Sequence, residues 1–154
     1  MRRLVIVGWA LMCAGASISA QQPASPEIAL APFAVVADQK GDLRKVADDC
    51  LDQLATALAA KGVKAARLQK LDEKTLATAR PARWAVLGKF EREKDTISAE
   101  LRLMEVATGD EIRSYFHTSK DPKDIAALGA RAADRIAGFV KEQRSAKPPV
   151  KGES

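Results

Sequence analysis

The chain has 154 residues and a formal net charge of +5, and a chain of this length can form one domain with one packed core. Only 5% of its residues are aromatic, so few side chains are available to stack on bases, and we expect no nucleic-acid binding. One of its two cysteines, Cys13, lies in an apolar leader. Removing that leader leaves Cys50 alone, which excludes an internal disulfide in the mature chain.

The first 20 residues have the order of a secretory signal peptide. Two arginines precede an apolar run over residues 4–14, and small residues follow as far as Ala20. A membrane anchor is the weaker alternative, because this run is shorter than the ~20 residues that span a bilayer. Lipidation of Cys13 is another alternative, although Met12 stands where a small residue normally precedes an acylated cysteine. We therefore predict a periplasmic protein that begins at Gln21, with 23 basic and 20 acidic residues.

A buried strand is predicted at the start of the domain, after a polar lead-in over residues 21–27. Residues 27–37 carry almost no charge, which is typical of a strand covered on both faces in a parallel arrangement. Pro32 interrupts this strand. Because proline cannot donate a hydrogen bond to the ladder, we expect a bend or a bulge there.

A long helix is predicted from Asp42, as its N-cap, to about Lys61, with Gly62 as its C-cap. Its apolar stripe recurs at three-to-four spacing and includes Cys50 and Leu54. We interpret Cys50 as a small buried residue rather than a reactive thiol, because the sequence offers it neither a partner cysteine nor a cluster of metal ligands.

A short, basic second strand is predicted over residues 63–68. Lys64 and Arg67 are typical of a sheet edge, where charge discourages unwanted strand pairing. We interpret these two side chains as candidate partner-binding residues, because an edge strand can dock a partner by strand addition. A short helix is then predicted to begin at Glu73, with Asp72 as its N-cap, and to end before Pro81.

Three antiparallel strands are predicted over residues 83–118. The middle strand alternates apolar and polar residues, with Leu101 on the apolar face. Trp84 lies on the dominant apolar face of the strand before it, and we expect its ring to be buried. The charged reversal at 93–95 and the Ala-Thr-Gly-Asp sequence at 107–110 are typical of hairpin turns.

A final helix is predicted to start at Asp121, with Pro122 in its first position, and to end near Gln143. Ile125 and Ile136 lie on its apolar stripe, and small residues between them allow close packing. Residues 144–154 are predicted to form a disordered basic tail.

These elements predict one α/β (α+β) domain over residues 28–143. A right-handed crossover pairs the first two strands in parallel, and the meander makes the sheet mixed. The expected five-stranded sheet has the order 2-1-3-4-5, with its first three strands parallel and helices on its apolar faces. The predicted core includes Phe33, Cys50, Leu54, Trp84, Leu101, Ile125 and Ile136.

The sequence has no motif that marks a catalytic or metal site. It lacks a Gly-rich phosphate loop, a Cys-x-x-Cys pair, a His-Glu-x-x-His helix and a Gly-x-Ser-x-Gly elbow. His117 is the only histidine, and one imidazole cannot build a multi-histidine zinc site, so we interpret it as a surface residue. The adjacent acids Asp48 and Asp49 are interpreted as surface charge. We expect no catalysis, no cofactor and no bound metal.

Residues 29–33, 46–54, 86–88 and 101–109 together resemble the N-terminal, non-propeller domain of TolB and TolB-like domains of bacterial envelope proteins. The same general fold is shared by curli-secretion and flagellar outer-membrane lipoproteins and by lipoprotein activators of peptidoglycan synthases. The resemblance implies an exported, non-catalytic module that binds an envelope protein. Alternatives are an outer-membrane lipoprotein activator or assembly factor, a small enzyme, and a weak binder of anionic membrane or cell-wall surfaces. The sequence indicates no oligomeric state.

Overall fold

The computed structural model describes residues 26–36, 38, 41–70, 76 and 78–146. Several predictions lie outside these residues. They concern the signal peptide, the lipidation of Cys13, the helix start at Asp72 and Glu73, and the last residues of the tail. No helix in the described part of the chain is both long enough and apolar enough to cross a membrane.

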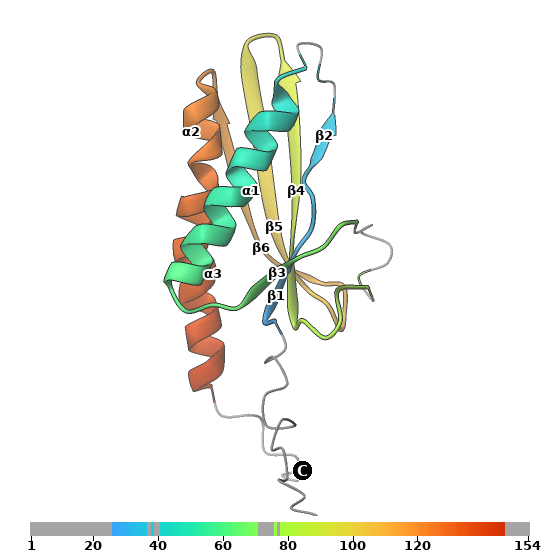
Figure 1. Cartoon of the computed structure of the whole chain (residues 1–154), viewed down its shortest axis with the longest axis vertical. Helices are drawn as coiled ribbons and strands as arrows, with labels where there is room; N and C mark the ends of the chain where they lie inside the picture. The colour runs from blue at the N-terminus through green and yellow to red at the C-terminus, as the bar shows by residue number, and fades with distance from the viewer. Residues whose placement is uncertain (1–25, 37, 39–40, 71–75, 77, 147–154) are drawn as a thin grey trace, which may run out of the picture.

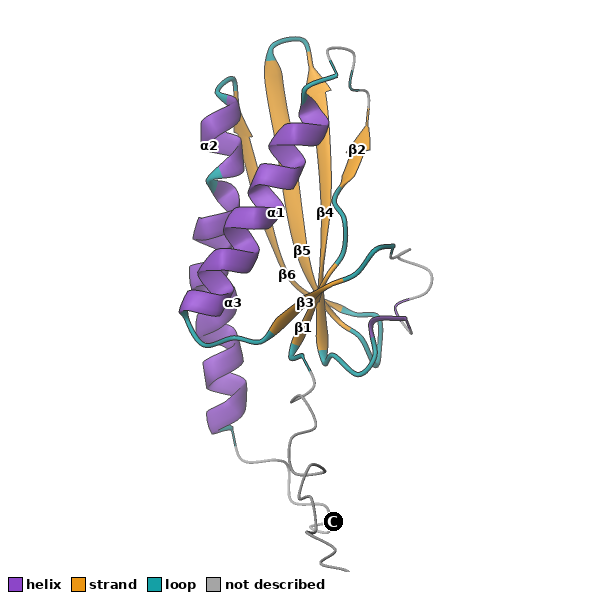
Figure 2. Ribbon diagram, viewed as in Figure 1, coloured by secondary structure: helices purple, strands orange, loops and turns teal. Residues whose placement is uncertain are grey.

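A mixed sheet forms the centre of the domain (Figures 1 and 2). Its strands are β1 (Ile28–Leu30), β2 (Ala34–Val36), β3 (Ala65–Arg67), β4 (Trp84–Glu93), β5 (Thr96–Glu105) and β6 (Glu111–Ser119). They lie in the order β3-β1-β4-β5-β6, and β2 also pairs with β4. Strands β3, β1 and β4 are parallel, whereas β4, β5 and β6 form an antiparallel meander. The predicted strand order and directions are confirmed.

The predicted first strand is divided into β1 and β2 at Pro32, which makes the sheet six-stranded rather than five-stranded. Leu30 pairs with Val86 and Ala34 pairs with Lys89. Between these two pairs the chain of β1 and β2 has one residue more than β4, which is the arrangement of a β-bulge. The expected irregularity at the proline is therefore confirmed.

Phe33 projects from this bulge into the core and requires a glycine opposite it. A β-carbon built on Gly88 would lie 2.4 Å from the Phe33 ring. Because glycine leaves that space open, the Phe33 ring reaches Phe90 and stacks on it with ring centroids 5.5 Å apart. This contact ties the bulge to the centre of β4.

Three helices lie on one side of the strands, as Figure 2 shows. They are α1 (Leu43–Ala60), α2 (Pro122–Ala126) and α3 (Leu128–Ser145). The prediction of one continuous final helix is wrong, because Ala127 separates α2 from α3 while keeping right-handed backbone angles (φ −66°, ψ −15°). The predicted end at Gln143 is also corrected, since α3 continues to Ser145.

Three helix-capping residues were predicted from the sequence, and the structure confirms two of them. Gly62 follows α1 with a positive φ of 77°, as expected of a C-cap glycine. Asp121 caps α2 by accepting a hydrogen bond from the Lys123 backbone N–H at 3.0 Å. The predicted N-cap role of Asp42 is wrong, because its side chain makes no capping hydrogen bond. Both its carboxylate oxygens lie 3.0 Å from Nη2 of Arg92 instead.

The main core lies between the sheet and the helices. All seven side chains expected there are buried, namely Phe33, Cys50, Leu54, Trp84, Leu101, Ile125 and Ile136. Burial raises the pKa of the Cys50 thiol to about 12, so this side chain stays protonated at neutral pH. A smaller apolar cluster around Leu76 and Leu87 covers part of the opposite sheet face.

Candidate functional site

Strands β2, β3 and β6 each pair with one described strand only and form the edges of the sheet, and the candidate residues from the sequence lie at β3. Strand β3 has three residues, and Lys64 directly precedes it. Nη1 of Arg67 lies 2.6 Å from Oδ1 of Asp52 on α1, so this cation is already paired within the chain. The backbone N–H of Lys64 donates to Oε2 of Glu27 at 3.3 Å. A partner-binding role for Lys64 and Arg67 stays a prediction.

Strand β6 is the longest of these edges, with nine residues against three in β2 and three in β3. Among the described strands it pairs only with β5. Phe116 lies at its middle, opposite Glu100, and is 67% exposed. Its neighbour Tyr115 lies opposite Leu101, on the side of the core. The sequence analysis missed this feature, although two adjacent aromatic residues on a strand must point to opposite faces.

A groove separates β6 from α3. Arg113, Tyr115 and His117 share the strand face that is turned toward the helices, because they pair with core residues of β5. The groove has a volume of about 340 Å³. We call it the β6 groove and define it by its lining residues, which are Ser114, Tyr115, Phe116 and His117 on β6 and Leu128, Arg131, Ala132 and Arg135 on α3. Arg131 and Arg135 are four residues apart on α3, a spacing that places both guanidinium groups on the same helix face.

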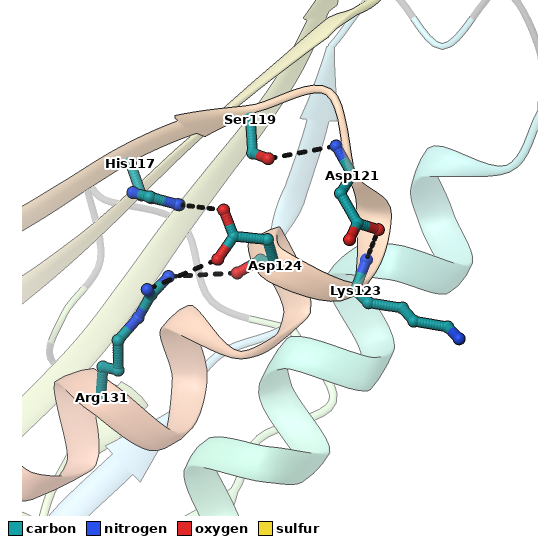
Figure 3. Close-up of polar contacts among 6 residues, drawn as sticks. All are labelled: His117, Ser119, Asp121, Lys123, Asp124 and Arg131. Atoms are coloured by element: carbon teal, nitrogen blue, oxygen red, sulfur yellow. Dashed lines mark hydrogen bonds and ion pairs between the residues drawn. The ribbon is translucent and has the colours of Figure 1, made fainter.

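Figure 3 shows that the carboxylate of Asp124, on α2, contacts two residues that line the groove, His117 and Arg131. Oδ2 of Asp124 lies 2.7 Å from Nε2 of His117, and its Oδ1 lies 3.5 Å from Nη1 of Arg131. Arg131 also donates from Nη2 to the backbone carbonyl of Asp124 at 3.1 Å. The hydrogen bond with His117 holds the pKa of Asp124 below its usual value. These contacts fix α2 against the end of β6.

The Tyr115 hydroxyl is the unusual group in the β6 groove. Its oxygen is buried and has no hydrogen-bond partner among the described residues. Burial raises the pKa of Tyr115, while the positive charges of Arg113 and Arg135 oppose that rise. At neutral pH the hydroxyl is therefore a protonated donor without an acceptor, next to two cations. Buried polar groups are normally satisfied, so this one marks a position where a ligand acceptor would fit.

The cluster of His117, Asp124 and Ser119 contains the residue types of a hydrolase triad but not its arrangement. In a triad the serine bonds to the imidazole, and the carboxylate bonds to the opposite side of that ring. Here His117 bonds to the carboxylate of Asp124, whereas the Ser119 hydroxyl accepts a hydrogen bond from the backbone N–H of Asp121 at 3.1 Å. The described residues also contain no group of three potential metal ligands. His117 is a half-buried residue in contact with Asp124 rather than a free surface residue.

A second, larger depression of about 660 Å³ lies between α1 and α2. Its lining mixes acids with lysines, among them Asp49, Asp52, Lys45 and Lys123. Opposite charges are therefore already interspersed there. The β6 groove differs in carrying one sign of charge.

Comparison with known proteins finds no matching family model and no matching curated protein. Solved structures share the fold at low sequence identity. A PelC dodecamer from Paraburkholderia phytofirmans is 17% identical, with 73% of this chain and 88% of that chain covered and a TM-score of 0.53. TolB from Acinetobacter baumannii is 15% identical, with coverages of 77% and 29% and a TM-score of 0.49. Lipoprotein GNA1162 from Neisseria meningitidis is 12% identical, with coverages of 80% and 100% and a TM-score of 0.47.

These similarities are distant and concern the fold. The chain is a single-domain α+β protein that shares its general fold with PelC from Paraburkholderia phytofirmans.

Proposed function

We propose that this chain is an exported, non-catalytic envelope protein that binds a protein partner by strand addition at β6. The main support for this proposal is the edge strand β6. It has nine residues, and the aromatic side chain of Phe116 near its centre is 67% exposed. An open edge strand presents unpaired backbone N–H and C=O groups that an extended segment can bond. Aromatic side chains are also enriched among the residues that dominate binding energies.

The opposite edge supports the same mode of binding less well. Strand β3 offers three residues, and Arg67 is paired with Asp52. A partner strand at β3 would therefore gain few backbone hydrogen bonds. Lys64 and Arg67 remain the second candidate surface, and they supply a comparison for the experiment.

Site-specific photocrosslinking in the native host tests this proposal. A photoreactive phenylalanine analogue replaces Phe116 on β6, and the same analogue at Lys64 reports on β3. A third variant carries it at Lys94, in the exposed turn between β4 and β5, as a control for nonspecific contact. We expect an irradiation-dependent adduct with one envelope protein from position 116 and none from position 94. An adduct from position 64 alone would move the binding surface to β3 and contradict the proposal.

The cellular location is tested separately by the intact mass of protein from the envelope fraction. Cleavage after Ala20 predicts a soluble periplasmic chain that begins at Gln21. A species that begins at Cys13 with a diacylglycerol adduct would contradict this and favour the lipoprotein alternative.

A further inference from the structure

We propose that the strand added at β6 is an acidic segment of the partner, whose carboxylates enter the β6 groove and bind Arg135 and the Tyr115 hydroxyl. This inference rests on the proposed function and names the chemistry of its ligand. The unpaired positive charge around the groove supports it.

The groove has an excess of positive charge that the chain does not neutralise. The carboxylate of Asp124 is already occupied by His117 and Arg131. Arg135 forms no ion pair among the described residues, and neither does Arg113. The Arg113 guanidinium does not line the groove and lies over the Phe139 ring, 5.8 Å from its centroid, so Arg135 is the groove cation left for a ligand.

The nearby acids cannot supply this charge, because each is paired elsewhere. Glu111, at the start of β6, lies 2.9 Å from Nε of Arg102. Asp134, next to Arg135 on α3, lies 2.7 Å from Nζ of Lys61. The missing acceptor must come from outside the described part of this chain.

Strand addition brings side chains to this groove at the right spacing. Alternate residues of an added strand point to the same sheet face, so every second side chain would be turned toward α3. Arg113, Tyr115 and His117 occupy that face of β6 in the same alternation. Carboxylates at those positions would accept charge-assisted hydrogen bonds from Arg135 and a hydrogen bond from the Tyr115 hydroxyl. Side chains at the intervening positions would lie beside Phe116, where an apolar residue fits best.

A second copy of this chain is a poorer occupant. Pairing β6 with β6 would bring the cationic rows of two molecules together, and like charges that face each other destabilise a strand pair. Charge complementarity therefore favours a different, acidic segment.

The test uses the full-length mature protein and synthetic extended peptides in which glutamate alternates with threonine. A matched peptide carries glutamine in place of each glutamate. Fluorescence anisotropy should show that the glutamate peptide binds more tightly, and that added salt weakens this binding because the contacts are ionic. Equal affinity for the two peptides would overturn the inference.

Two variants locate the binding. Arg135→Glu should lower the affinity for the glutamate peptide roughly tenfold or more, because it reverses a charge in the groove. Lys141→Glu makes the same charge change on α3 outside the residues that line the groove, and it should have little effect. Equal losses in both variants would indicate a general charge effect and would overturn the inference.

Tyr115→Phe provides a readout that a structural role would not give. It removes a hydroxyl that has no partner in the free protein, so thermal stability should be unchanged or higher. Affinity for the glutamate peptide should nevertheless fall. Unchanged affinity would remove the hydroxyl from the site and contradict the inference.

The outcomes separate the two proposals. Crosslinking at position 116 together with equal binding of both peptides would leave the proposed function standing and reject the acidic segment. Absence of both crosslinking and peptide binding would reject both. Self-association that is lost in Phe116→Ser would assign the edge to a second copy and also reject the acidic segment.

Discussion

Gly129 on α3 lies against the backbone of Cys50 on α1. A β-carbon built on Gly129 would lie 2.1 Å from the Cys50 carbonyl oxygen and 3.0 Å from the backbone nitrogen of Leu54. No real side chain tolerates these distances, so the glycine sets how closely the two long helices approach. That approach brings α3 over the sheet and, with it, positions the wall of the β6 groove.

Gly129→Ala should therefore lower the free energy of unfolding by about 3 kcal/mol or more, because the helices must separate. Gly138→Ala is the matched control on the same helix. A β-carbon at Gly138 would meet nothing within 4 Å, so alanine there should stabilise the protein by about 0.5–1 kcal/mol through its helix propensity. Urea unfolding of the three proteins checks both values. Equal changes in unfolding free energy at the two positions would contradict the close approach of α1 and α3.

The ion pair between Arg92 and Asp42 gives a second stability prediction. The Arg92 side chain is only 8% exposed, so removing its partner leaves a guanidinium charge out of water. Asp42→Ala should cost about 2–3 kcal/mol, and Arg92→Met should cost less, because methionine leaves no unpaired charge. The exposed pair of Arg44 and Asp48 is the control, and Asp48→Ala should cost less than about 1 kcal/mol. Similar losses in Asp42→Ala and Asp48→Ala would show that the Arg92 pair is solvated.

Trp84 reports on the packing of α3 against the sheet. Its side chain is 4% exposed, and its ring meets Phe139 edge to face with centroids 5.4 Å apart. In a chain that begins at Gln21 it is the only tryptophan. Its emission should therefore be blue-shifted in the native state and move to the red in one cooperative step on unfolding. Trp84→Ala should cost about 3–5 kcal/mol. A native spectrum typical of tryptophan in water would contradict this packing.

Glu27 and Arg144 predict the acid dependence of stability. They are 117 residues apart in sequence, and Nε of Arg144 donates to Oε1 of Glu27 at 2.7 Å. This hydrogen bond lowers the pKa of Glu27 below its usual value of 4.5. A lowered pKa in the folded state stabilises the protein above pH 4.5, and this contribution is lost as the pH falls through the folded-state pKa.

Glu27→Gln should therefore be less stable than the wild type at neutral pH and should show a shallower loss of stability on acidification. Urea midpoints measured between neutral pH and pH 3 check this, with Glu111→Gln as an exposed acidic control. If the urea midpoints of wild type and Glu27→Gln changed with pH in parallel, that would contradict the lowered pKa of Glu27.

The strand order could be predicted from the sequence because its determinants are local. Pro32 marks the bulge, alternation around Leu101 defines the middle strand, and Gly109 takes a positive φ of 74° in its turn. Predictions failed where a residue distant in the sequence determines the contact. Asp42 reads as a helix cap, but Arg92, 50 residues away, takes its carboxylate.

The candidate site was missed for the same physical reason. The sequence analysis interpreted His117 as a surface residue and singled out neither Arg131 nor Arg135. Only the packing of α3 beside β6 brings them to one groove with the unpartnered hydroxyl of Tyr115. The exposure of Phe116 depends on β6 being an edge, which its own sequence does not encode.

Amide hydrogen exchange tests strand addition at β6 most directly. It compares the mature protein alone with the same protein in complex with the partner identified from position 116. The β6 amides that do not bond to β5 should exchange rapidly in the free protein, and they should become protected in the complex because they then bond to the added strand. Unchanged exchange along β6, with protection confined to β3 or to the helices, would contradict the proposal.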